Sequence, residues 1–335
     1  DPVLLPRQLF LSVFLTIISI IFYIKIKKRK LVIRNKIFKT NLFAAFLGFI
    51  LINFISSSWA ISFSEAIYVS SKNSLFFALF LITTILIKEK EIRISILSKG
   101  VLFSVFTTLV IVGYQSLQLL SSGNDFFENI NFIKGTYANK NLLSSTLFLS
   151  IPFVFMSTKL GKAWKTFSLI ILFSLFIAVW MLQSKAVFLA TLISIISFCI
   201  LTLLFSKKSF LNLGFKIGIL IGILSLIITL TFLNKDKFTK LTSTRTAYTR
   251  LDIWEKSVDL VSENWILGVG SGNWKINLPK YGLDHFESKF VRNGLTIYQR
   301  PHNDFLWVLC ETGIIGLIFF ISIFLSVIIY LTVLI

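Results

Sequence analysis

One histidine stands where a proton acceptor could work. His302-Asn303 is followed by nine residues, then by Gly313, two residues and Gly316, at the start of the last apolar stretch. Imidazole titrates near neutral pH and is the commonest general base in proteins, and the glycines would let a helix pack closely against its neighbours. A histidine at a helix start can equally cap or pack that helix, so the residues alone leave both roles open.

The segment 234–303, which precedes the apolar stretch, is where a polar face for chemistry is expected. Within 248–264, apolar side chains recur at spacings of three and four, which predicts an amphipathic helix; they are Leu251, Trp254, Val258 and Val261. A glycine-rich turn, Gly268 to Trp274, follows. It follows a helix rather than a strand, so it favours a tight turn over a phosphate cradle.

No metal or cofactor is expected. His285 is the only other histidine and is interpreted as a surface residue, while the two cysteines, Cys199 and Cys310, form no cluster with ligand spacing. The loops predicted below to lie on the outer side of a membrane also lack an Asp-x-Asp or Glu-x-Asp pair of the kind that holds a divalent ion. The sequence therefore favours metal-independent chemistry.

The composition indicates an integral membrane protein. Of 335 residues, 55% are apolar and 15% charged, against about 45–50% and 25% in soluble domains. The net charge of +19 would suggest a nucleic-acid partner in a soluble chain. Here the charges lie between apolar runs long enough to cross a bilayer, so no nucleic acid is expected and membrane lipid is the expected surroundings.

Nine apolar stretches approach the length of about 20 residues that a spanning helix needs. They are 8–24, 41–59, 68–87, 101–119, 142–157, 166–183, 186–205, 217–233 and 314–335. Only Gln183, Ser184 and Lys185 interrupt the run between 166 and 205, which predicts two helices joined by a tight turn. If the spans alternate, more than half of the 34 basic residues share one side, which the positive-inside rule makes cytoplasmic.

The predicted fold is thus an all-α polytopic membrane bundle with at least nine transmembrane helices and a large periplasmic loop of short helices. Residues 1–233 would hold eight helices, 234–303 the loop, and 304–335 the last helix. The chain begins with Asp1 rather than Met and ends inside an apolar run. Further helices are therefore expected at both ends.

The His302 motif resembles the signature of the O-antigen ligase and polymerase superfamily of bacterial membrane glycosyltransferases. Three other segments agree with the family: 250–254 with the glycine turn 267–270, the Asn-containing segment 135–141, and 185–189. In the last, Lys185 stands where the family has arginine. The resemblance extends from about residue 40 to the end.

The resemblance implies transfer of a glycan from an undecaprenyl-diphosphate carrier to an acceptor hydroxyl at the periplasmic face of the inner membrane. The lipid A core is the acceptor of ligases, and another carrier-linked glycan that of polymerases. It also implies a GT-C-like bundle and inverting transfer by direct displacement. A groove open to lipid is expected, because the polyprenyl tail must stay in hydrocarbon while the diphosphate reaches the rim.

On this hypothesis the chemistry needs a base for the acceptor and cations for the diphosphate. His302 would be the base, and nearby cations would keep its imidazole neutral. Lys185 and Arg250 would be the other catalytic residues, as cations for the diphosphate. The expected substrate-binding residues are Arg300 and Arg245 as reserve cations, Asn303, Asn141, Trp254, Gly268 and Gly270.

Each residue also has a structural interpretation. Lys185 could extend from its turn to the headgroups, Arg250 could be a solvated helix residue, and Asn303 and Asn141 could be helix caps. A ligase and a polymerase share the motif, so the sequence does not separate them. From other classes, a lipid-linked glycan flippase or a docking subunit stays open, although no inverted repeat is visible.

Overall fold

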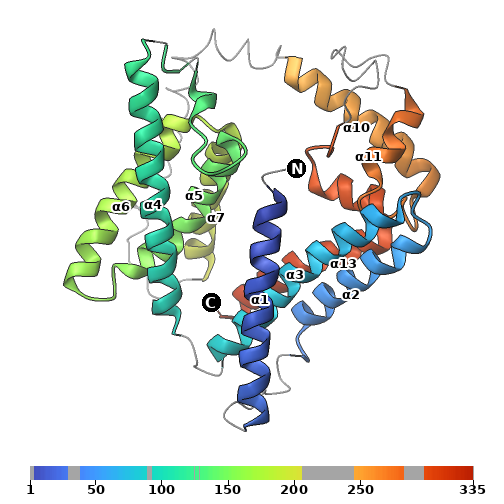
Figure 1. Ribbon diagram of the computed structural model, residues 1–335, viewed down its shortest axis with the longest axis horizontal. Coiled ribbons are helices and arrows are strands. Elements are labelled where there is room, and N and C mark those ends of the chain that lie inside the picture. Colours follow the sequence, from blue (N-terminus) through green and yellow to red (C-terminus); the bar gives the residue numbers. More distant parts are fainter. Residues whose placement is uncertain are drawn as a thin grey trace. The chain divides into compact units, whose positions relative to one another are not determined.

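The computed structural model describes residues 4–28, 38–88, 93–123, 125–127, 129–205, 245–282 and 298–334 (Figure 1). All regular secondary structure in these ranges is helical, which confirms the predicted all-α class. Six helices are long and apolar enough to cross a membrane, judged by length and composition: Leu9–Lys27, Asn41–Ser58, Phe63–Ile87, Ile94–Ser121, Lys162–Leu182 and Asp304–Leu331.

The helices follow the predicted stretches but have their own limits. They are α1 Leu4–Lys27, α2 Asn41–Ile55, α3 Phe63–Lys88, α4 Ile94–Ser121, α5 Lys140–Ser157, α6 Lys162–Leu182, α7 Lys185–Phe205, α10 Arg245–Asn264, α11 Trp274–Asn277 and α13 Asp304–Leu334, with 3-10 turns η1 Ser56–Ser58, η2 Ile130–Phe132 and η3 Leu278–Tyr281.

Two of the nine predicted spans are helical without joining the six. They are 142–157, which is α5 with Pro152 inside it, and 186–205, whose helix α7 is apolar over Lys185–Ser197. The eighth predicted span, 217–233, lies outside the described residues. Nine spans therefore stay a prediction.

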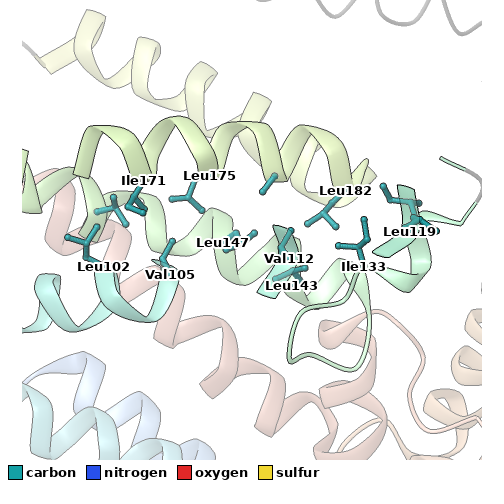
Figure 2. Close-up of a cluster of buried hydrophobic side chains, with 13 residues drawn as sticks. Leu102, Val105, Val112, Leu119, Ile133, Leu143, Leu147, Ile171, Leu175 and Leu182 are labelled. Carbon is teal, nitrogen blue, oxygen red and sulfur yellow. The ribbon is translucent and has the colours of Figure 1, made fainter. Parts of the chain in front are cut away.

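The chain groups into two compact units, residues 1–85 with 225–335, and residues 86–224. The boundaries of these units differ from those of the three predicted segments, 1–233, 234–303 and 304–335. In the second unit, α4, α5 and α6 enclose an aliphatic core (Figure 2). Leu102, Leu143, Leu147 and Leu175 are fully or almost fully buried in it. The predicted tight turn between α6 and α7 is present, with Gln183 at a left-handed φ of 48°.

In the unit of residues 1–85 and 225–335, α13 packs along α2. A Cβ added at Gly48 of α2 would collide with the ring of Phe319 on α13, and the rings of Phe49 and Phe320 lie 5.4 Å apart. The α3 helix joins them through Phe46 and Phe77, whose ring centroids are 5.0 Å apart. The close approach at Gly48 lets aromatic side chains fill the interface.

The amphipathic helix expected at 248–264 is α10, but its buried face differs from the predicted one. Ile253, Ser257 and Leu260 are buried, with Trp254 and Val261 packed beside them, whereas Leu251 and Val258 are each 56% exposed. The spacing rule found the helix, yet two stripes satisfied it. The stripe that faces Trp274 and Cys310 is the one that is buried.

Candidate active site

His302 lies just before α13 in a backbone conformation that is uncommon for residues other than glycine. Its φ is +60°, and Gln183 is the only other described non-glycine residue with a positive φ. Such residues tend to occur at functional sites, because the surrounding structure must hold them there. The sequence placed His302 on the first turns of a helix, and the structure corrects this: the helix begins two residues later, at Asp304.

Asn303 caps this helix. Its Oδ1 accepts a hydrogen bond from the backbone N–H of Leu306 at 3.2 Å, and its carbonyl accepts one from Trp307 at 2.9 Å. The structural interpretation of Asn303 is therefore observed. The cap fixes the chain direction at the residue that follows His302.

Helix α10 is fastened to the histidine segment by Trp254. The indole N–H of Trp254 donates to the carbonyl of Pro301, 2.8 Å away. Arg250 lies one helical turn before Trp254. Its side chain is exposed, and so are those of Arg300 and His302. The structure thus brings together three of the predicted site residues, His302, Arg250 and Arg300, and gives Trp254 a role in holding them.

The electrostatic surroundings favour a neutral imidazole. Although His302 is exposed, partial burial of its imidazole lowers its pKa below the ordinary value of 6.5, and the charges of Arg250 and Arg300 lower that pKa further, while Asp304 opposes them. A lowered pKa means that the imidazole is unprotonated at pH 7. A neutral imidazole can accept a proton, as a general base requires.

The glycine turn packs against α13 by backbone contact. The N–H groups of Val269 and Gly270 donate to the carbonyls of Cys310 and Glu311 at 2.9 and 2.8 Å. A Cβ added at Gly268 would collide with the backbone of Glu311. These amides are occupied within the protein, which leaves Gly268 and Gly270 in the packing of the turn rather than facing a ligand with free donors.

Gly313 is the other half of this contact. It has φ 63° and ψ −168° and interrupts the helical geometry of α13, and a Cβ there would collide with the carbonyl of Ile266. The next residue, Ile314, donates its N–H to Trp265 at 2.8 Å. The expected close packing at Gly313 therefore occurs at a kink in α13, where the backbone of the loop after α10 contacts the helix.

Glu311 is a buried carboxylate that the sequence analysis did not single out. Its Oε1 accepts from the indole N–H of Trp307 at 2.7 Å and from the backbone N–H of Trp274 at 3.3 Å. The indole of Trp274 donates in turn to Ser257 on α10 at 3.0 Å. A carboxylate inside an apolar stretch is a signal that could have found this residue, because such a group is costly there unless it is bonded.

Lys185 and Asn141 belong to the unit of residues 86–224. Lys185 is exposed at the first residue of α7. The cap of α5 is Asn139, whose Oδ1 accepts from the N–H groups of Asn141 and Leu142, each at 3.0 Å. Asn141 is therefore not the cap that it could have been, and its side chain is exposed.

Lys140, at the first residue of α5, is a second cation at this end of the unit. Burial lowers its pKa, and the charge of Lys185 lowers it further. Lys140 lies among polar residues, Asn139 and Asn141, rather than between apolar runs, so no sequence pattern marks it. Two like charges that act on each other form a natural place for an anion.

Arg245 is the first residue of α10, and its side chain lies outside the part of the chain whose side chains are described, as His285 lies outside the described residues altogether. Among the described residues, no group of three or more His, Cys, Asp or Glu side chains could hold a metal ion.

Residues 167–321 match the model of a protein family described as O-antigen ligase. No curated protein matches the chain, and no solved structure does.

Proposed function

We propose that the chain is a membrane glycosyltransferase of the O-antigen ligase superfamily, whose family model residues 167–321 match, and that it transfers a glycan from an undecaprenyl-diphosphate carrier to an acceptor hydroxyl. The acceptor is the lipid A core, and the reaction takes place at the periplasmic face of the bacterial inner membrane. The observation that carries the proposal is the imidazole of His302, which two arginines help to keep neutral.

The proposed step is a direct displacement. The imidazole of His302 takes the proton of the acceptor hydroxyl, the acceptor oxygen forms a bond to the anomeric carbon, and the bond from that carbon to the diphosphate oxygen breaks. The carrier leaves as undecaprenyl diphosphate, and the configuration at the anomeric carbon inverts. The diphosphate is already a good leaving group, so no general acid is required.

Cations stabilise the charge that develops on the diphosphate. Arg250 and Arg300, which lie beside His302, supply these cations. Arg245 is a further cation on the same helix as Arg250. In the unit of residues 86–224, Lys185 stays the diphosphate cation that the sequence predicts, and its charge acts on Lys140. Lysine presents a point charge rather than the bidentate fork of arginine, so a pair of lysines is a reasonable replacement for one family arginine.

A polymerase of the same superfamily is the second candidate, because it uses the same donor and the same base. The two differ in the acceptor, which is a second carrier-linked glycan for a polymerase. The surface exposure of His302, Arg250 and Arg300 suits an acceptor that approaches from the aqueous side in either case.

The test is glycan profiling of the producing strain with the wild-type gene or His302→Ala, with His285→Ala as the matched control. We expect His302→Ala to abolish attachment of glycan to its acceptor at a normal protein level, while His285→Ala leaves it unchanged. Long carrier-linked chains that accumulate would identify a ligase, and single repeat units a polymerase. An unchanged profile in His302→Ala would refute the enzymatic proposal and favour a transporter or a docking subunit.

A further inference from the structure

A polar pocket within the unit of residues 1–85 and 225–335 is not used by the steps above. It has a volume of about 240 Å³ and lies between α2, α3 and α13. Its polar lining consists of Asn53, Lys72, Asn73, Asp304, Trp307, Glu311 and Thr312, and aromatic and aliphatic side chains complete the wall. Polar groups of opposite charge gathered in a hollow of a membrane protein are a strong sign of a ligand site.

Two of these side chains already have their hydrogen bonds within the protein. The amide of Asn53 donates to the carbonyl of Phe49 at 2.6 Å, and its oxygen accepts from Asn73 at 3.1 Å and from Ser271 at 2.8 Å. Glu311 accepts from Trp307 and Trp274. Asn53 and Glu311 therefore build the pocket wall rather than wait for a ligand.

Three polar groups of the lining remain available. In the ranges that the structure describes, neither the Lys72 ammonium, nor the Asn73 amide oxygen, nor the Asp304 carboxylate has a hydrogen-bond partner. Lys72 is half-buried on α3, a helix apolar enough to span a membrane. A cation at such a position is expensive to keep without a bonded partner. The charges of Glu311 and Glu65 act on Lys72, but neither carboxylate lies within hydrogen-bond distance of it in the part of the chain that the structure describes.

The combination of groups selects the chemistry of the ligand. A hydroxyl both donates and accepts, so a ring of hydroxyls can donate to Asp304 and Asn73 and accept from Lys72. A diphosphate would face the carboxylates of Asp304 and Glu311 and be repelled. The volume is slightly below the roughly 300–1,000 Å³ of most small-molecule sites, which suits a single sugar ring.

The pocket also adjoins the proposed base. Asp304 lines it, and the charge of the same carboxylate acts on the imidazole of His302, two residues earlier. We propose that this pocket is a monosaccharide subsite, in which Lys72, Asn73 and Asp304 hydrogen-bond the hydroxyls of one pyranose ring beside His302. The inference deepens the proposed function. It rests on that function only for the identity of the substrate that carries the ring.

Filling the pocket tests the subsite directly. Val308 lines the pocket, and Val327 lies on the same helix with 43% of its surface exposed, so Val308→Phe and Val327→Phe add the same bulk inside and outside it. The probes are free glucose, galactose, mannose, rhamnose and N-acetylglucosamine, observed by saturation-transfer NMR on the full chain in lipid nanodiscs. At least one sugar should give a signal that falls five-fold or more in Val308→Phe and is unchanged in Val327→Phe.

Lys72→Gln and Asn73→Leu provide the second measurement, since they remove polar contacts rather than space. Each should weaken the same sugar signal at least three-fold while the protein keeps its melting temperature. The absence of a signal from all five sugars would overturn the subsite, as would equal signals in Val308→Phe and Val327→Phe, or an undiminished signal in both polar variants.

Transfer kinetics identify the substrate that carries the ring, using the lipid-linked donor and the acceptor extracted from the producing strain. In Val308→Phe, a higher KM for the donor alone places the donor sugar in the pocket, and a higher KM for the acceptor alone places the acceptor sugar there. The sugar signal should survive in His302→Ala. If transfer also persists in His302→Ala, the proposed function fails while the subsite stands.

Discussion

The two compact units differ in the groups that their cores bury. In residues 86–224 the core is aliphatic, built from side chains such as Leu102 and Leu147, and the buried hydroxyls of Ser144 and Ser168 have no partner there among the described residues. In residues 1–85 and 225–335, buried polar groups such as Ser271 and Glu311 are bonded across elements distant in sequence. Apolar packing sets only volume, whereas hydrogen bonds set direction. The directional network belongs to the unit that positions His302.

If backbone contact organises the His302 unit, a single methyl group at Gly313 should have the largest effect. Gly313→Ala places a Cβ against the carbonyl of Ile266 at a positive φ, so we expect a loss of stability of about 3 kcal/mol or more. Gly100→Ala is the control, because a Cβ there meets no atom within 4 Å. Thermal unfolding followed by intrinsic tryptophan fluorescence measures both. Equal melting temperatures would show that the kink is not needed.

In the aliphatic unit the corresponding experiment removes volume. Leu147 is 1% exposed and Leu149, two residues further along α5, is 69% exposed. Leu147→Ala should destabilise the protein by about 2–5 kcal/mol through the cavity it leaves, whereas Leu149→Ala should have little effect. The same thermal assay compares them. If the two variants unfold alike, the buried cluster does not determine the stability of this unit.

The sequence predicted most of the helices because apolar length and helical spacing are local properties. It predicted the tight turn at Lys185 and the helix that carries Arg250 for the same reason. It predicted part of the buried face of α10 wrongly: Leu251 and Val258 are exposed, although they satisfy the helical spacing as well as the buried Ile253 and Leu260 do. Only the partner surface, which comes from Trp274 and Cys310, decides between the two stripes.

Within the candidate site, the residues found from sequence were those with a motif, and those missed depend on distant contacts. The charges of Arg250 and Arg300, both in predicted segments, act on His302, but the bond from Trp254 to Pro301 spans 47 residues. The polar pocket that Lys72 lines is formed by residues of α3 together with residues of α13. No local pattern records such pairings, although charges within apolar stretches, as at Lys72 and Glu311, mark where to search.

Removing one directional bond next to His302 should affect stability less than it affects catalysis. Trp254→Phe keeps the ring in the α10 core but removes the N–H that donates to Pro301 at 2.8 Å, which should lower stability by about 1 kcal/mol. We expect a larger proportional loss in kcat, on the order of ten-fold, because a base that shifts from its position loses much of its effect. Trp265→Phe is the control, since that side chain is 57% exposed. Equal kcat values in the two variants would separate Trp254 from catalysis.

The finest effect concerns the proton on His302. Burial and the two arginines lower its pKa from 6.5, and only the neutral imidazole accepts a proton, so transfer should persist somewhat below pH 6.5 and fall as the pH drops through the lowered pKa. Arg250→Gln removes one positive charge, which makes the imidazolium less unfavourable and raises that pKa. The acidic limb of the pH–rate profile should therefore move to higher pH. Lys256→Gln, on the same helix but paired with Asp259 at 3.7 Å, should leave the limb in place. A shift of equal size in both variants would indicate a general charge effect of α10, and no shift in either would mean that the limb belongs to another group.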